Sequence, residues 1–193
     1  MNTLPNFFIA GAPRCGTTAL SEYLRRHPQV FMTIPKEPNY FAADLPGLRF
    51  ADTPEQYADL FRKVGSHHLA IGEASVWYLY SKVALDRIRQ EIPHARIIVS
   101  LRNPIDFVRS LHARLLYSHN EDRANLAEAW AMQDTRREGR ELPRSVQTPE
   151  LLQYREIAMF GRQISRLFDA FPREQVRVVL LEEWRDDPRG TYL

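Results

Sequence analysis

Apolar and polar positions along the chain form blocks that predict strands alternating with helices. Short apolar runs predict strands, and apolar positions three or four apart predict helices. The polar stretch 136–148 lacks either pattern and predicts a surface excursion. By these patterns we expect strands at residues 7–10, 69–72, 96–101 and 176–181, and helices at about 17–26, 54–64, 82–90, 104–117 and 151–171.

This alternation predicts an α/β fold, a three-layer α/β/α arrangement with a central parallel sheet. In such sheets ligands bind at the carboxyl ends of the strands. Two loops, one after Ala10 and one after Leu101, are expected at that edge. They are the first places to look for chemistry.

Composition narrows the class of protein. The chain has 193 residues, 44% of them hydrophobic, which suits one domain with a sizeable core. Its 26 basic and 24 acidic residues give a formal net charge of +2, and this balance is too even for a general nucleic-acid binder. Cys15 is the only cysteine, so an intrachain disulfide and a thiolate zinc cluster are excluded. The histidines show no metal-ligand spacing.

No apolar run is long enough for a membrane span, and the N-terminus does not resemble a signal peptide. We therefore expect a cytoplasmic protein.

The loop after the first strand reads Gly11-Ala12-Pro13-Arg14-Cys15-Gly16-Thr17-Thr18. It has the glycine spacing of a nucleotide-triphosphatase P-loop, but Thr17 stands where that motif needs Lys. Glycines let the backbone curl around an anion, and the N–H groups of the helix N-terminus point at it. Arg14 adds a positive charge, and Thr17 and Thr18 add hydroxyl donors. A strand–turn–helix corner with a chance pair of glycines is the structural alternative.

The segment GAPRCGTTAL resembles the 5′-phosphosulfate-binding loop of sulfotransferases that depend on 3′-phosphoadenosine 5′-phosphosulfate (PAPS). Many cytosolic members have Lys at the position of Arg14, whereas tyrosylprotein and several carbohydrate members have Arg. The resemblance implies a P-loop-like phosphosulfate-binding loop formed by Arg14, Cys15, Gly16, Thr17 and Thr18. A sulfuryl group carries less negative charge than a γ-phosphoryl group, so Arg14 and backbone donors can stabilise its transfer without a metal ion.

A second segment, IIVSLRNPIDFVRS, places Arg102 just past a strand and Ser110 eight residues later. It is similar to the 3′-phosphate-binding motif of the same family, which implies that Arg102 and Ser110 bind the 3′-phosphate of PAPS and of the product nucleotide PAP. Taken alone, an Arg at a strand end is an ordinary ion-pairing residue. Two motifs in the family's order, about 90 residues apart, are much more specific, and FPREQVRVVLLEEWRDDP also resembles the family's late strand and acidic loop.

Transfer to a hydroxyl acceptor needs a base. The segment PKEPNYF resembles a K-E-x-x-F-F segment of carbohydrate and bacterial members, which implies that Glu37 is the catalytic base; a solvated Lys-Glu pair is the alternative. Glu73, in GEASVWYLY, resembles a residue near the acceptor and is the second choice for the base. Asn39 and Tyr40 are expected near the acceptor, although core packing accounts for Tyr40 equally well.

Several features depart from the family pattern. Asn39 stands where heparan-type members often have His, Val76 replaces a usual Pro, and Phe160 falls where Tyr is common. The family usually continues some tens of residues beyond the position of Leu193, so we expect residues 1–193 to be a single sulfotransferase domain that lacks its C-terminal part.

The resemblance predicts an enzyme that transfers a sulfuryl group from PAPS to a hydroxyl group on a small molecule, sugar, lipid or peptide. Two alternatives stay open: a catalytically incomplete module that binds PAPS or PAP, and a P-loop phosphotransferase. The missing P-loop Lys argues against the phosphotransferase. The acceptor and the oligomeric state are not determined by the sequence.

Overall fold

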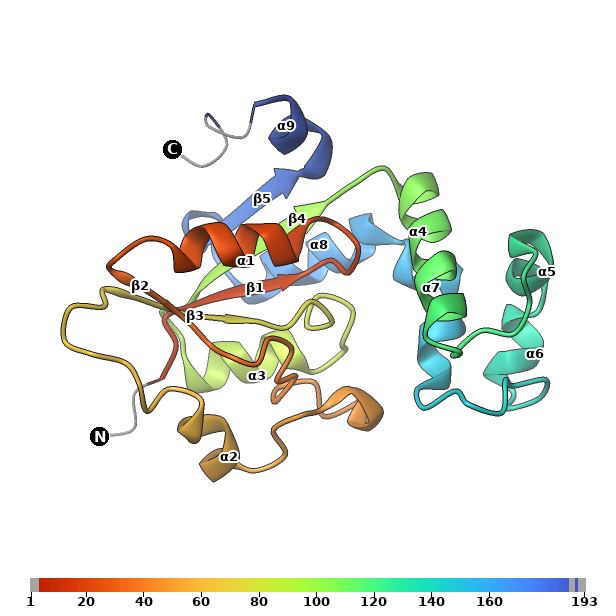
Figure 1. Ribbon diagram of the computed structural model, residues 1–193, viewed down its shortest axis with the longest axis horizontal. Helices are drawn as coiled ribbons and strands as arrows, with labels where there is room; N and C mark the ends of the chain where they lie inside the picture. The colour runs from red at the N-terminus through yellow and green to blue at the C-terminus, as the bar shows by residue number, and fades with distance from the viewer. Residues whose placement is uncertain (1–3, 188–189, 191–193) are drawn as a thin grey trace.

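The computed structural model describes residues 4–187 and 190 (Figure 1). Its centre is a parallel sheet of five strands in the order β2-β3-β1-β4-β5. The strands are β1 (Phe7–Gly11), β2 (Val30–Met32), β3 (Ala70–Ala74), β4 (Arg96–Leu101) and β5 (Val176–Leu180). The α/β fold with a central parallel sheet is confirmed.

Helices connect the strands and cover both faces of the sheet. The α-helices are α1 (Thr17–Arg25), α2 (Pro54–Asp59), α3 (Ala84–Glu91), α4 (Pro104–Tyr117), α5 (Leu126–Ala131), α6 (Gln133–Arg137), α7 (Tyr154–Ile157), α8 (Phe160–Ala170) and α9 (Leu181–Asp186). Short 3-10 helices in the described residues are η1 (Pro46–Leu48), η2 (Pro149–Leu152) and η3 (Arg173–Gln175).

Alternate residues of β1 enter two different cores, because successive side chains of a strand point to opposite faces. Phe7 and Ile9 belong to a small core with Leu20 and Leu24 of α1. Phe8 belongs to the main core, which also contains side chains of α3 and α8. The sheet is therefore the middle of three layers.

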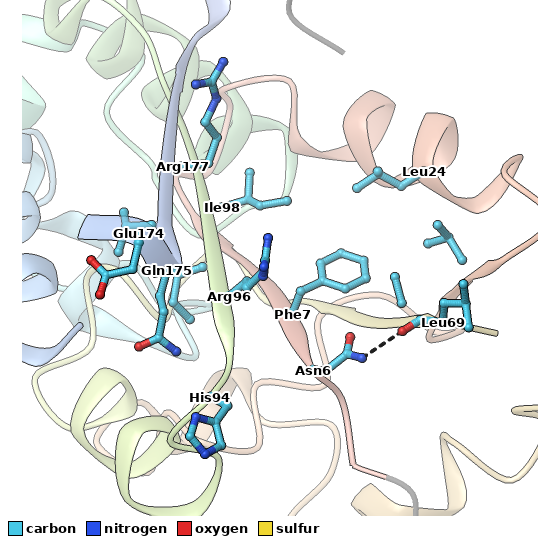
Figure 2. Close-up of a pocket in the computed structure, with 14 residues that line it drawn as sticks. Asn6, Phe7, Leu24, Leu69, His94, Arg96, Ile98, Glu174, Gln175 and Arg177 are labelled. Carbon is cyan, nitrogen blue, oxygen red and sulfur yellow. Dashed lines mark hydrogen bonds between the residues drawn. The ribbon is translucent and has the colours of Figure 1, made fainter. Parts of the chain in front are cut away.

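A groove of about 690 Å³ lies beside α1, at the amino ends of the strands. Figure 2 shows Phe7, Leu24 and Ile98 on its apolar side, with Arg96 and Arg177 nearby. The loops after β1 and β4 leave the opposite edge of the sheet. The groove is thus separate from the edge at which the sequence predicts chemistry.

Three predicted segments differ from the structure. The helix predicted over 54–64 ends at Asp59, because the next residues form tighter turns, such as the bond from Phe61 N to Ala58 O. The helix predicted over 151–171 is divided into η2, α7 and α8 by non-helical backbone at Gln153 and Met159. The predicted surface excursion at 136–148 was wrong at its start, because Arg136 is fully buried at the end of α6.

Candidate active site

The loop after β1 (residues 11–16, the Gly11 loop) turns sharply before α1 begins at Thr17. Arg14 and Gly16 have left-handed backbone, with φ of 63° and 79°. Glycine adopts this conformation without strain, whereas it is uncommon for other residues. Thr17 is buried and Thr18 is exposed. The loop therefore has the strand–turn–helix form in which backbone N–H groups can face an anion.

Arg14, Arg102 and Ser110 lie together although they are far apart in the sequence. Arg14 Nε donates a hydrogen bond to Ser110 Oγ at 3.1 Å. Arg102 Nη1 donates to the carbonyl oxygen of Arg14 at 3.3 Å. Arg102 Nε is buried and has no hydrogen-bond partner within the described ranges. Two guanidinium groups, a hydroxyl group and an unused donor suit an anionic ligand, because a buried donor without a partner is costly.

The side chain of Cys15 faces the interior. Its Sγ donates to the carbonyl oxygen of Pro13 at 3.3 Å, and Ser100 Oγ donates to the carbonyl oxygen of Cys15. Burial raises the pKa of the Cys15 thiol to about 12. The thiol therefore stays protonated at neutral pH, and Cys15 can meet a ligand through its backbone only.

Helix α9 packs over the Gly11 loop. A Cβ atom at Gly16 would lie 2.7 Å from Leu181 and 2.9 Å from Trp184. Glu182 Oε1 accepts a hydrogen bond from Asn103 N at 2.9 Å, directly after Arg102. The sequence predicted an acidic loop here, whereas 181–186 is helical, and Pro188 lies outside the described residues. The only sequence signal for these contacts was the resemblance of this segment to the family's late strand.

Glu37 lies at the carboxyl end of β3. Its backbone N–H donates to the carbonyl oxygen of Ala74 at 2.9 Å, and its Oε2 accepts from Val76 N at 2.9 Å. Lys36 forms an ion pair with Oε1. The Glu37 side chain is 32% exposed, so it is held by these two groups while part of it stays accessible.

The turn that follows β3 joins Glu37 to the Gly11 loop. Leu79 N donates to Ala10 O at 2.8 Å, and a Cβ atom at Gly11 would lie 2.6 Å from Leu79 Cβ. Val76, which holds the Glu37 carboxylate, belongs to the same turn. The Glu37 segment and the Gly11 loop therefore occupy the same edge of the sheet.

The three residues expected near the acceptor lie beneath this surface. Asn39 is 3% exposed, and its Nδ2 donates to the carbonyl oxygens of Glu37 and Leu48. Tyr40 stacks on Tyr57 with ring centroids 4.3 Å apart. Glu73 is fully buried. In this structure they support the Glu37 segment from below.

Within residues 4–187 and 190, no three acidic, histidine or cysteine side chains are grouped so that they could hold a metal ion. No helix in the same part of the chain is long and apolar enough to cross a membrane.

A model of the sulfotransferase family matches residues 5–82. Among curated proteins, the chain is similar to "Membrane-associated sulfotransferase kil1" of Dictyostelium discoideum, with 33% identity over 105 residues, covering 53% of the chain and 21% of the relative. It is also similar to human "Carbohydrate sulfotransferase 15", with 30% identity over 148 residues, covering 55% of the chain and 26% of the relative. The chain thus spans about a quarter of the length of these relatives.

Two solved structures share the fold. The sulfotransferase domain from the curacin biosynthetic pathway has a TM-score of 0.59 at 14% identity, covering 100% of this chain and 72% of that one, which shows the fold alone. The crystal structure of a sulfotransferase from Alicyclobacillus acidocaldarius has a TM-score of 0.84 at 32% identity, and the match covers 96% of this chain and 76% of that one. With similarity over nearly the whole chain, the family-model match and the geometry of the two loops, the chain belongs to the sulfotransferase family.

Proposed function

We propose that the protein transfers a sulfuryl group from PAPS to a hydroxyl acceptor. The observation that carries this proposal is the convergence of Arg14, Arg102 and Ser110 at the carboxyl ends of β1 and β4. This edge is where parallel sheets bind ligands. The Gly11 loop would hold the 5′-phosphosulfate, and Arg102 with Ser110 would hold the 3′-phosphate.

In the proposed reaction the oxygen of the acceptor hydroxyl group forms a bond to sulfur. The bond between sulfur and the 5′-phosphate oxygen of PAPS breaks, and PAP leaves with that electron pair. Glu37 takes the acceptor proton. Its carboxylate is suited to this role because Lys36 and Val76 N fix its position while about a third of the side chain stays exposed. Arg14 neutralises charge on the group in transfer and on the leaving 5′-phosphate.

The hydrogen bonds among Arg14, Arg102 and Ser110 indicate how the nucleotide would be accommodated. Arg14 donates to Ser110, so the two side chains lie close enough together for both to turn toward phosphate oxygens of bound PAPS. Arg102 Nε, which has no partner among the described residues, would gain one. No metal is required in this scheme, because guanidinium groups and backbone donors supply the positive charge.

The test is mass-spectrometric detection of sulfated product when the protein is incubated with PAPS and a panel of phenols, sugars, lipid alcohols and hydroxyl-bearing peptides, with and without EDTA. Product that persists in EDTA supports the proposal. Tight binding of PAP without product from any acceptor would support the catalytically incomplete module instead. Transfer from ATP that depends on magnesium would favour a phosphotransferase.

A further inference from the structure

Glu73 is the penultimate residue of β3, and its carboxyl group is enclosed by the protein. Oε2 accepts hydrogen bonds from Tyr78 at 2.8 Å and from Tyr57 at 3.1 Å. Oε1 has no hydrogen-bond partner in the part of the chain that is described. Burying a carboxyl group costs free energy when one of its oxygens has no hydrogen-bond partner. Its position beneath a candidate active site therefore indicates a functional role.

The hydroxyl groups around Glu73 also hold the loop that carries Glu37. Tyr78 Oη accepts from Phe41 N at 3.4 Å. Ser75 Oγ accepts from Asn39 N at 2.9 Å. The ring of Tyr57 stacks on Tyr40. Three successive residues of the loop, 39 to 41, are therefore anchored to side chains that surround the Glu73 carboxyl group.

The direction of these hydroxyl protons depends on Glu73. An ionised carboxylate can only accept hydrogen bonds, so Tyr57 and Tyr78 must donate to it. Tyr78 Oη then presents its lone pair to Phe41 N. A protonated carboxyl group can donate instead, and a hydroxyl group that accepts this proton is free to turn its own proton elsewhere. The state of Glu73 is thus transmitted to the loop backbone.

Charged and titratable groups face this cluster from several sides. Burial is the main cause that raises the pKa of Glu73 to about 7, and the charge of Glu37 adds to it, while the hydroxyl groups of Ser75, Tyr78 and Tyr57 lower it. Burial also raises the pKa values of both tyrosines well above 10. On the outer side, Lys36 pairs with Glu37, and Arg87 of α3 lies over Tyr40 and Phe41 and pairs with Glu91.

We propose that Glu73 is a positioning residue, whose carboxyl group orients Tyr57 and Tyr78 and thereby holds the loop from Glu37 to Phe41 at the sheet edge. The proposal rests on the proposed role of Glu37 as the base. Glu73 itself does not touch the acceptor; it acts through the loop. Its ionised form holds the loop more firmly than its protonated form.

The direct test follows the backbone amide signals of Asn39 and Phe41 by NMR of the ligand-free protein between pH 5 and 9. In the wild-type protein both signals should shift with a midpoint near pH 7. In Glu37→Gln both should still shift, with a somewhat lower midpoint, because the charge of Glu37 contributes to the raised pKa of Glu73. In Glu73→Gln the shift should disappear, because the amide side chain does not titrate. A wild-type protein without the shift, or a Glu73→Gln protein that keeps it, would overturn the proposal.

Two further variants distinguish loss of this coupling from misfolding of the protein. Tyr78→Phe retains Glu73 but removes the hydroxyl group that links it to Phe41, so the Phe41 amide should lose the transition. Tyr154→Phe is the matched control, because Tyr154 donates to a different buried carboxylate, Glu121, at 2.7 Å. That variant should keep the transition of the loop amides.

Kinetic measurements then connect the loop to transfer. With PAPS and the best acceptor of the panel, Glu73→Gln should lower kcat by about tenfold and leave the dissociation constant of PAP within about twofold. If Glu37→Gln turns over normally while the loop amides titrate as expected, the base assignment fails and the coupling of Glu73 to the loop stands. If the amides do not titrate while Glu37→Gln is inactive, the coupling fails and the base assignment stands.

Discussion

Arg102 has both a structural bond and an unused donor. Its Nη1 supports the Gly11 loop through Arg14 O, and its Nε is buried without a partner among the residues described. Substitution by alanine removes a charged hydrogen bond worth roughly 1.5–3 kcal/mol. Arg102→Ala should therefore weaken PAP binding at least about tenfold. It should weaken 5′-AMP binding much less, because AMP lacks the 3′-phosphate and uses only the Gly11 loop that Arg102 supports. Isothermal titration calorimetry with both nucleotides measures this difference.

Arg109→Ala is the matched control for that measurement. Arg109 lies on α4 like Ser110, but its guanidinium group is exposed and pairs with Asp106 at 3.8 Å. Its removal should change the affinity for PAP by less than about twofold. Equal affinity of the wild-type protein for PAP and AMP would contradict the assignment of Arg102 and Ser110 to the 3′-phosphate.

Glu37→Gln, again a single-residue change, tests the proposal that Glu37 is the base. The amide retains the shape and can still accept from Val76 N, but it cannot take a proton. Turnover should fall by roughly 10²–10⁴-fold, the usual contribution of a positioned base, while PAP binding stays within about twofold. Glu22→Gln serves as the control, because Glu22 forms a solvent-exposed pair with Arg25 on α1. Normal turnover of Glu37→Gln would exclude Glu37 as the base.

Packing between elements explains why Gly11 has no side chain. The turn after β3 approaches so closely that a Cβ atom would lie 2.6 Å from Leu79 Cβ. Gly11→Ala should destabilise the protein by about 1–3 kcal/mol, since overpacking displaces the neighbouring backbone. Gly161→Ala lies in α8, where no described residue beyond the helix's own neighbouring backbone would come within 4 Å of the new methyl group. It should stabilise the protein by up to about 1 kcal/mol. Urea denaturation of both variants checks the opposite signs.

The sequence predicted those elements whose pattern is local. The predicted strand Arg96–Leu101 is present. Helix α4 begins at Pro104 as expected, because the Asn103 side chain caps it by accepting a hydrogen bond from Ile105 N. The resemblance named the loop residues, and the structure brings Arg14, Arg102 and Ser110 together. The contacts of α9 with the Gly11 loop could not be predicted, since they join segments more than 150 residues apart.

Long-range ion pairing also explains the error around Arg136. Its guanidinium group binds both carboxylate oxygens of Glu121, at 2.6 and 2.7 Å, and Tyr154 donates to the same carboxylate. The residues around Arg136 show no apolar periodicity that would predict a buried side chain at this position. It is buried because its partner lies 15 positions earlier in the chain and is enclosed with it. Apolar patterns in a sequence predict side chains that are buried by hydrophobic packing, whereas Arg136 is buried because it pairs with a carboxylate.

At the scale of the whole molecule, two buried carboxyl groups give stability opposite dependences on pH. Burial would raise the pKa of Glu121, but hydrogen bonds from Arg136, Arg123 N and Tyr154 lower it to about 2. Its stabilising contribution is present above the unfolded pKa of 4.5 and is lost as pH falls toward 2. Burial raises the pKa of Glu73 to about 7, so the folded protein binds more protons than the unfolded chain between pH 4.5 and 7. Stability is then lost as pH rises through that window.

The expected result is a maximum of the free energy of unfolding near pH 4.5 from these two groups, each contributing roughly 3 kcal/mol over its window. Urea denaturation at closely spaced pH values measures the curve. Glu73→Gln should remove the decline between pH 4.5 and 7 and leave the acid limb unchanged. A decline of the same size in the variant would assign it to other groups.

The central position of β1 has a consequence for how the chain folds. This strand is the first in sequence, yet it pairs with β3 and β4, which lie some 60 and 90 residues later. Closing such long loops costs entropy before any sheet contact can repay it. During synthesis the apolar strand Phe7–Gly11 therefore has no sheet partner until Ala74 has left the ribosome, and its second edge stays unpaired until β4 follows. The sheet that supports both loops forms late, and the interval before it closes is when this chain is most exposed to aggregation.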